Sequence, residues 1–330
     1  MLAIRLHALG DVVITLPYLK ALSEDHPETA IDFVTLAENA DIPRAVALFD
    51  RVFAIGGGRS PRGHLVAATA LAPRLMARRY DVVVDLQRNR ASRWMRRMIA
   101  PKAWSEFDRY SARSAGERTQ ETITFAGLGG PTTTAPLPMH DPAAGLQLLY
   151  QAGWNGRDPL VVLNPAGCWN TKNWPLAAYI DFARLWRQST PWSATRFLLL
   201  GTASLAASAA EIRAELGATV LDLVGRTSPA EAYAILRRAA LIVTDDSGLM
   251  HMAWVSGVPT VALFGASRAY WSAPQGAHTR TLDSSDMPCG QCMQPVCALG
   301  DVRCLKRHTP ARVYELAREL TDSVAMASAL

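Results

Sequence analysis

The sequence has little that would place the chain inside a membrane or in an extended, unfolded class. Charged residues make up only 19% of its 330 residues, and no low-complexity tract stands out. No stretch reaches the roughly 18 uninterrupted apolar residues that a membrane-spanning helix needs. The first residues are apolar, but Arg5, His7 and Asp11 interrupt them and no small-residue cleavage site follows. We therefore expect a cytoplasmic globular protein that can touch a membrane without crossing it.

Cysteine is also scarce, with five residues in the whole chain, but four of the five are clustered. The cluster has the spacing C-x2-C-x4-C-x6-C and consists of Cys289, Cys292, Cys297 and Cys304. A tight cluster in a cytosolic chain favours a metal over a disulfide framework. Four thiolates can bind Zn²⁺ or hold an iron–sulfur cluster. Disulfides and free thiols stay open as alternatives.

Positive charge is concentrated in one segment. The net charge is +5, and residues 88–118 contain nine Lys or Arg against three acids. A segment of this kind fits an acidic partner, a membrane surface or nucleic acid, or it is only a solvated helix face.

Strand-like and helix-like stretches alternate in both halves of the chain. We expect strands at residues 3–6, 30–36, 51–55, 81–86, 160–164, 196–200, 220–223, 241–244 and 258–264. Continuous apolar strands that alternate with helices favour parallel sheets covered on both faces. The predicted fold class is therefore α/β, with two Rossmann-like, doubly wound domains whose strand ends face a central cleft.

A proline-rich stretch, residues 129–142, separates the two halves and suits neither a helix nor a central strand. We place a linker after it. The predicted organisation is an N-terminal domain at 1–142, a linker at 143–158, a C-terminal domain at 159–309 with the cysteine loop at 289–304, and a final helix at 310–330.

Three segments follow expected strands and carry polar residues. In HALGDVVITLP, Gly10 would permit a tight turn, and Asp11 would then open a helix. Asp11 either caps that helix or projects from the carboxyl edge of the sheet, where a carboxylate can take a proton from a hydroxyl nucleophile.

The second segment is NPAGCWNTKNWP, in which small residues let the backbone approach a ligand. Thr171 and Lys172 add a hydroxyl and a point charge, a mixture that suits a diphosphate. The spacing of a Walker loop is absent. A plain loop with a surface lysine is the alternative.

The third segment is LIVTDDSGLMH. Ser247 and Gly248 begin a helix whose free N–H groups and dipole favour an anion. Asp245 and Asp246 would repel a phosphate beside them, so we expect one of them to cap the helix or to accept hydrogen bonds from sugar hydroxyls. His251 can donate to a phosphate or a sugar, or it is a core residue.

These segments, together with LVGRTSPAEAYAILRRAA and VPTVALFG, resemble the lipopolysaccharide heptosyltransferases of glycosyltransferase family 9. The order and spacing match over nearly the whole chain. The resemblance implies a GT-B fold and inverting transfer of a heptose from ADP-heptose. It also implies an acidic, lipid-linked core oligosaccharide as the acceptor, at the inner-membrane surface.

The resemblance also assigns roles by motif position. Asp11 matches the general base, and Lys172 matches the lysine that faces the donor phosphates. The donor-binding positions it implies are Gly10, Asn170, Thr171, Lys172, Asp246, Ser247, Gly248 and His251.

Charge alone suggests acceptor-binding residues, namely Arg59, Arg62, Arg93 and Arg97. No separate D-x-D loop is present, so we expect a lysine and a helix dipole to stabilise the leaving group without a required cofactor. We expect a monomer without a nucleic-acid partner. The alternatives are transfer from another nucleotide sugar, an epimerase or hydrolase on the same fold, and a non-catalytic nucleotide- or metal-binding regulator.

Overall fold

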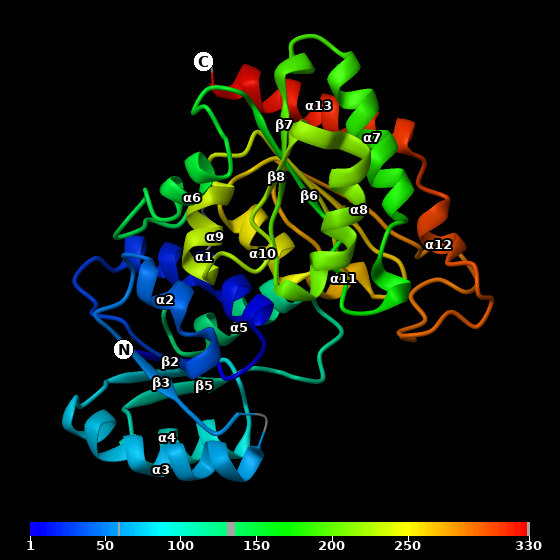
Figure 1. The fold of residues 1–330 in the computed structure, drawn as a ribbon. Helices are drawn as coiled ribbons and strands as arrows, with labels where there is room; N and C mark the ends of the chain where they lie inside the picture. Colours follow the sequence, from blue (N-terminus) through cyan, green and yellow to red (C-terminus); the bar gives the residue numbers. More distant parts are fainter. Residues whose placement is uncertain (59, 131–135, 329–330) are drawn as a thin grey trace. The chain divides into compact units, whose positions relative to one another are not determined.

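The computed structural model describes residues 1–58, 60–130 and 136–328. The chain divides into two compact units, Met1–His140 (unit 1) and Asp141–Leu330 (unit 2). Each unit is built on its own sheet, and Figure 1 shows helices on both faces of each sheet.

Unit 1 has a five-stranded parallel sheet of order β3-β2-β1-β4-β5. Its strands are β1 (Leu2–Ile4), β2 (Asp32–Leu36), β3 (Arg51–Ile55), β4 (Val82–Asp85) and β5 (Ala103–Glu106). Its helices are α1 (Leu9–Asp25), η1 (Ala37–Asn39), α2 (Asp41–Ala45), α3 (Pro61–Ala77), α4 (Arg90–Ile99) and α5 (Ala115–Phe125).

Strand β1 shows why both faces of this sheet are covered. All three of its residues are fully buried, and side chains alternate between the two faces of a strand. Leu2 and Ile4 belong to the core formed with α3 and α4. Ala3 belongs to the core formed with α1 and α5. The continuous apolar strand is therefore the signature of a sheet between two helix layers.

Unit 2 has a six-stranded parallel sheet of order β11-β10-β9-β6-β7-β8. Its strands are β6 (Leu160–Asn164), β7 (Arg196–Leu199), β8 (Val220–Asp222), β9 (Leu241–Asp245), β10 (Thr260–Leu263) and β11 (Thr279–Leu282). Its helices are α6 (Leu146–Gln151), η2 (Asn170–Lys172), α7 (Leu176–Gln188), η3 (Trp192–Ala194), η4 (Ala203–Leu205), α8 (Ala206–Leu216), η5 (Gly217–Thr219), α9 (Pro229–Leu236), α10 (Gly248–Val255), α11 (Ala269–Ser272), α12 (Arg303–Lys306) and α13 (Pro310–Ser328).

Each sheet has one point where the strand order reverses. In unit 1 this switch point lies between β1 and β4, and in unit 2 it lies between β6 and β9. The helices that leave two neighbouring strands there go to opposite faces, which leaves the carboxyl ends of those strands open to a ligand. All three sequence segments that carried polar residues follow one of these four strands.

The prediction of two doubly wound parallel α/β domains is confirmed by this topology. The edge strands β5 and β11 and the helix α5 were not predicted from the sequence. Both strands are short, and most of their residues are only partly buried. An edge strand packs on fewer neighbours, so its sequence needs no continuous apolar run.

Candidate active site

The switch point of unit 1 gathers charged side chains around Asp11. Helix α1 begins at Leu9, so Gly10 lies inside its first turn and the expected tight turn at Gly10 is wrong. Arg5 Nη2 donates to Asp11 Oδ1 at 2.9 Å. His7 Nδ1 lies 2.5 Å from Asp11 Oδ2. The carboxylate is therefore held from two sides by residues that follow β1.

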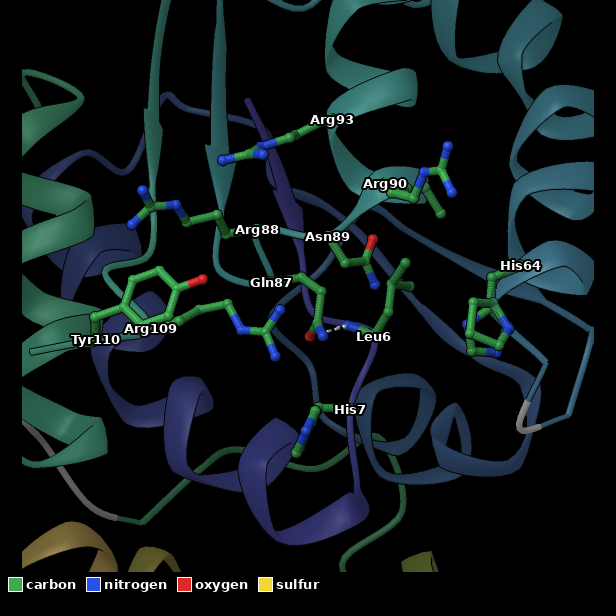
Figure 2. Close-up of a pocket in the computed structure, with 12 residues that line it drawn as sticks. Leu6, His7, His64, Gln87, Arg88, Asn89, Arg90, Arg93, Arg109 and Tyr110 are labelled. Atoms are coloured by element: carbon green, nitrogen blue, oxygen red, sulfur yellow. Dashed lines mark hydrogen bonds between the residues drawn. The ribbon is translucent and has the colours of Figure 1, made fainter.

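The segment that carries His7 is fixed by its neighbours. Leu6 N donates to Gln87 Oε1 at 3.1 Å, the bond drawn dashed in Figure 2. Asn39 Nδ2 donates to the His7 carbonyl at 2.6 Å. Burial lowers the pKa of Arg5, and the charge of Asp11 and its hydrogen bond oppose that shift. Because these contacts come from the ends of three strands, the position of Asp11 and His7 is set by the sheet.

A basic pocket of about 820 Å³ opens beside this cluster, within unit 1. Four arginines and two histidines contribute to its wall, as Figure 2 shows. These are Arg88, Arg90, Arg93, Arg109, His7 and His64. They follow strands β1, β3, β4 and β5, so the pocket lies at the carboxyl edge of the sheet.

The arginines of this pocket differ in their partners. Arg93 donates two hydrogen bonds to Glu106, both 3.0 Å. Arg88 lies 3.5 Å from Glu106 and 3.3 Å from Asp108. Burial alone would raise the pKa of Glu106, but these arginines and Arg96 lower it. Within the described residues, Arg90 and Arg109 form no ion pair, so their charge is available to a ligand.

The four predicted acceptor residues do not all line this pocket. Arg59 lies outside the described residues. Arg93 lines the pocket but is paired with Glu106. Arg62 and Arg97 are exposed on α3 and α4 and are not among the residues found to line it in the described part of the chain. Sequence reasoning missed Arg109, because the strand β5 that precedes it was not predicted.

In unit 2, the donor-loop candidates surround an ion pair. Lys172 ends the short helix η2 after β6, and its Nζ lies 2.6 Å from Asp246 Oδ2. Their side chains are only 13% and 11% exposed. The Lys172 ammonium also lies 4.8 Å from the centre of the Trp169 ring. Asn170 is exposed on the same loop.

The two adjacent acids of DDSG have different surroundings. Asp245 ends β9, is fully buried and accepts a hydrogen bond from Trp174 N at 3.0 Å. Burial raises the pKa of Asp245 well above its ordinary value, although the bond from Trp174 acts in the opposite direction. Asp246 instead points to Lys172. The strand thus stops at one structural acid and one acid that is paired with a cation.

Helix α10 begins directly after this pair, as expected. Ser247 is its N-cap and accepts from Met250 N at 3.3 Å. Ser247 Oγ also donates to Asn164 Oδ1 at 2.8 Å, and Asn164 ends the neighbouring strand β6. Gly248 is the first residue of the helix, and His251 is buried at 6% exposure. The start of α10 is therefore tied to the same edge as Lys172.

The cysteine loop packs against the donor loop. Thr171 Oγ1 donates to the Gln294 carbonyl at 2.6 Å, and Met293 N donates to the Ala266 carbonyl at 2.8 Å. A Cβ atom at Gly265 would collide with the Thr171 carbonyl, so glycine lets the segment after β10 approach the donor loop. Thr171 is 2% exposed, and its hydroxyl serves this junction.

All four clustered cysteines line one cavity of about 110 Å³ beside Thr171. Their thiols are free, and backbone hydrogen bonds from Val302 and Leu299 lower the pKa of Cys297. Burial raises the pKa of Cys304. In the part of the chain that the structure describes, no three Cys, His, Asp or Glu side chains are arranged to hold a metal ion.

The described helices include none with the length and apolar character needed to span a bilayer.

Two doubly wound parallel sheets in one chain make the GT-B architecture of glycosyltransferases. The chain belongs to glycosyltransferase family 9 (heptosyltransferase), whose family model matches residues 128–303, more than half of its length. It is therefore a glycosyltransferase.

Individual relatives agree with this assignment. Lipopolysaccharide heptosyltransferase 1 of Pseudomonas aeruginosa is 28% identical over 90% of this chain and 87% of its own. The structure of Escherichia coli ADP-heptose lps heptosyltransferase II is 20% identical, with a TM-score of 0.73, and covers 98% of this chain and 99% of its own. The iron-containing dodecameric glycosyltransferase TibC of enterotoxigenic E. coli is 14% identical, with a TM-score of 0.56, over 98% of this chain and 76% of its own.

Proposed function

We propose that this enzyme transfers a heptose from ADP-heptose to a lipopolysaccharide core or related lipid-linked acceptor, with inversion at the sugar. The observation that carries the proposal is the Lys172–Asp246 pair beside the start of α10. The names of the relatives support the choice of donor and acceptor, because they are heptosyltransferases and one is named for ADP-heptose.

On the donor side, the charges at the carboxyl edge of unit 2 suit a diphosphate. A diphosphate leaving group develops negative charge as the glycosidic bond breaks, and fixed positive groups there lower the barrier. Lys172 Nζ is held at the carboxyl edge by Asp246, and α10 presents free backbone N–H groups next to it. The diphosphate would take over the lysine from Asp246, and Asp246 would then accept hydrogen bonds from hydroxyls of the donor. We place Asn170, Ser247, Gly248 and His251 around the same donor.

On the acceptor side, the basic pocket of unit 1 suits an acidic acceptor. Arg90 and Arg109 have no acidic partner among the described residues, which suits an acceptor that carries carboxylates or phosphates. Asp11 lies beside the pocket and supplies the carboxylate of the base that accepts the proton of the acceptor hydroxyl. Exposed Trp104 and Tyr110 lie among the arginines of unit 1, a mixture that suits the surface of a membrane with acidic lipids.

Transfer in this proposal needs no metal ion. Metal-dependent sugar transfer uses carboxylates that are open to a divalent cation. Here Asp245 is fully buried, and Asp246 already faces the Lys172 ammonium. The lysine supplies the positive charge that a metal would otherwise bring to the diphosphate.

We also propose that the cysteine loop holds a structural metal ion. The chemistry of the donor set fits, since four thiols around one small cavity are typical ligands for Zn²⁺ or iron. TibC, a structural relative, is named as iron-containing. The thiols would have to close on the ion, because no metal-ready group is present among the described residues. Such an ion would brace the loop that contacts Thr171. Elemental analysis of protein purified without added metal tests this, with a Cys289→Ser/Cys292→Ser variant as the control that should lose the ion.

Calorimetric titration with ADP, UDP, GDP and ADP-heptose in EDTA tests the donor. Binding of ADP and ADP-heptose, with much weaker binding of UDP and GDP, is the expected result. A preference for UDP or GDP would be consistent with a glycosyltransferase but would rule out ADP-heptose as the donor. Donor turnover is then measured with and without a heptose-free lipopolysaccharide core. Turnover that needs no acceptor would favour an epimerase or hydrolase, and no nucleotide binding at all would favour a regulator.

A further inference from the structure

His7 is in contact with Asp11, the residue that the proposed function places in the general base. Asp11 Oδ1 accepts from Arg5, and Asp11 Oδ2 lies 2.5 Å from His7 Nδ1. A carboxylate held by a guanidinium can only accept hydrogen bonds. The hydrogen in the contact with His7 must then be on Nδ1. The neutral imidazole in this contact therefore has its lone pair on Nε2, the nitrogen that can take a proton.

His7 is also placed rigidly. Its carbonyl accepts from the buried Asn39 at 2.6 Å, and the preceding Leu6 is bonded to Gln87 at 3.1 Å. Behind Asp11, Arg5 is buried at 5% exposure. Arg5 holds the carboxylate, the carboxylate orients the imidazole, and the segment from β1 holds both. In the same way, a carboxylate orients the histidine that acts as the general base in many enzymes.

The exposure of the two side chains also favours His7 as the group that meets the acceptor. The His7 side chain is 52% exposed and lines the basic pocket, whereas the Asp11 side chain is 30% exposed and is not among the residues found to line it. Figure 2 shows His7 on the opposite side of the pocket from Arg90 and Arg93. An acceptor whose acidic group contacts the arginines would therefore have a base on the other wall.

We propose that His7 Nε2 is the atom that accepts the proton of the acceptor hydroxyl, and that Asp11 is the positioning residue behind it. In this step the acceptor O–H bond breaks and its proton goes to Nε2. The acceptor oxygen forms the new bond to the anomeric carbon of the donor sugar. The bond from that carbon to the diphosphate breaks, and its electron pair leaves with the nucleoside diphosphate. The inference rests on the proposed transfer but not on the identity of the sugar.

The first test is the tautomer of His7 in the resting enzyme, read from two-bond ¹H–¹⁵N correlations of the imidazole. We expect the form with hydrogen on Nδ1 in the wild type, and its loss in Asp11→Asn. The form with hydrogen on Nε2 in the wild type would overturn the proposal. This measurement needs no donor, so its failure is separate from failure of the proposed function.

The second test is kinetic. His7→Ala should lower kcat by roughly 10²–10³-fold, within the range of lost general-base catalysis, with little change in donor affinity by calorimetry. Added imidazole should restore part of the rate in His7→Ala but not in wild type. His26→Gln, at the other end of α1, is the matched control and should keep wild-type rates.

The outcomes separate the possibilities. If His7→Ala keeps kcat within threefold while Asp11→Asn abolishes transfer, Asp11 takes the proton directly and the proposal is wrong. A loss of rate without rescue by imidazole, together with a lowered melting temperature, would reduce His7 to a structural role. If the wild type uses another nucleotide sugar, the same variants are compared with that donor. If it transfers no sugar to any acceptor, both proposals fail.

Discussion

The two switch points differ in how much of their charge is neutralised within the protein. In unit 2, Lys172 and Asp246 are paired at 2.6 Å and are nearly buried. In unit 1, four arginines line a pocket of about 820 Å³, and two of them have no acidic partner in the described part of the chain. One edge holds a compact ion pair, whereas the other presents an excess of positive charge.

This difference matches what each edge would have to bind. A leaving diphosphate is small, and its stabilisation requires a cation in a fixed place before the reaction. The bonds from Ser247 and Thr244 to Asn164 provide that rigidity in unit 2. A large acidic acceptor instead needs room and several cations with spare hydrogen-bond donors. The same doubly wound topology therefore gives a fixed cation in one unit and an open, positively charged pocket in the other.

Loss of the lysine should have the largest effect. Lys172→Met should lower kcat/KM by about 10²–10³-fold, because the developing charge on the diphosphate loses its fixed cation. The substitution also leaves Asp246 nearly buried without its cation, which should lower the free energy of unfolding by about 3 kcal/mol. Steady-state kinetics and chemical denaturation measure the two effects.

A paired variant separates catalysis from stability here. Lys172→Met/Asp246→Asn removes both charges, so most of the lost stability should return while the rate stays low. If the rate returned with the stability, the lysine would be a structural element, and the contrast between the two edges would lose its catalytic meaning.

The next effect concerns the open edge. Arg109→Gln and Arg90→Gln should each raise the KM for the acceptor about tenfold, the usual consequence of losing one charge-assisted hydrogen bond. Donor affinity should not change. Arg97→Gln removes an equal charge from the exposed face of α4 and should leave both constants unchanged. A similar KM increase in Arg97→Gln would mean that the whole basic surface attracts the acceptor, without a defined pocket.

Arg109 also shows where sequence reasoning ends. The strands at the switch points, β1, β6 and β9, are fully buried, so their apolar runs could be read directly, together with the motifs that follow them. Part of the pocket wall comes from the segment after β5, an edge strand without such an apolar run. Because β5 was not predicted, the position of Arg109 could not be predicted either. Partners are harder still to predict, because a pairing such as Lys172 with Asp246 joins residues far apart in the chain.

A smaller effect concerns the buried acid beside the ion pair. Burial raises the pKa of Asp245 above its ordinary value of 3.8, so the folded protein holds this proton to higher pH than the unfolded chain does. The contribution of Asp245 to the free energy of unfolding is therefore greatest below about pH 3.8, and it falls as the pH rises toward the raised pKa. Asp245→Asn keeps an oxygen for Trp174 N and removes the titration.

The melting temperature of Asp245→Asn should consequently exceed that of the wild type by roughly 2–4 °C at pH 7.5, a gain of about 1 kcal/mol. The difference should shrink toward pH 4. Asp246→Asn is the comparison, since that acid is stabilised by Lys172 and its loss should lower the melting temperature. A constant advantage of Asp245→Asn at every pH would show that packing, not titration, is the cause.

Removal of divalent cations should have the smallest effect, and it tests the preorganised edge directly. Lys172 already provides the positive charge at the proposed diphosphate site, so EDTA should change the transfer rate by no more than about twofold. Add-back distinguishes the two places where a metal could act, because Mg²⁺ prefers oxygen ligands and Zn²⁺ binds thiolates. A large loss restored by Mg²⁺ would show that the diphosphate needs a metal and that the lysine is insufficient. A loss restored only by Zn²⁺ or iron would locate the effect in the cysteine loop, which contacts the donor loop at Thr171.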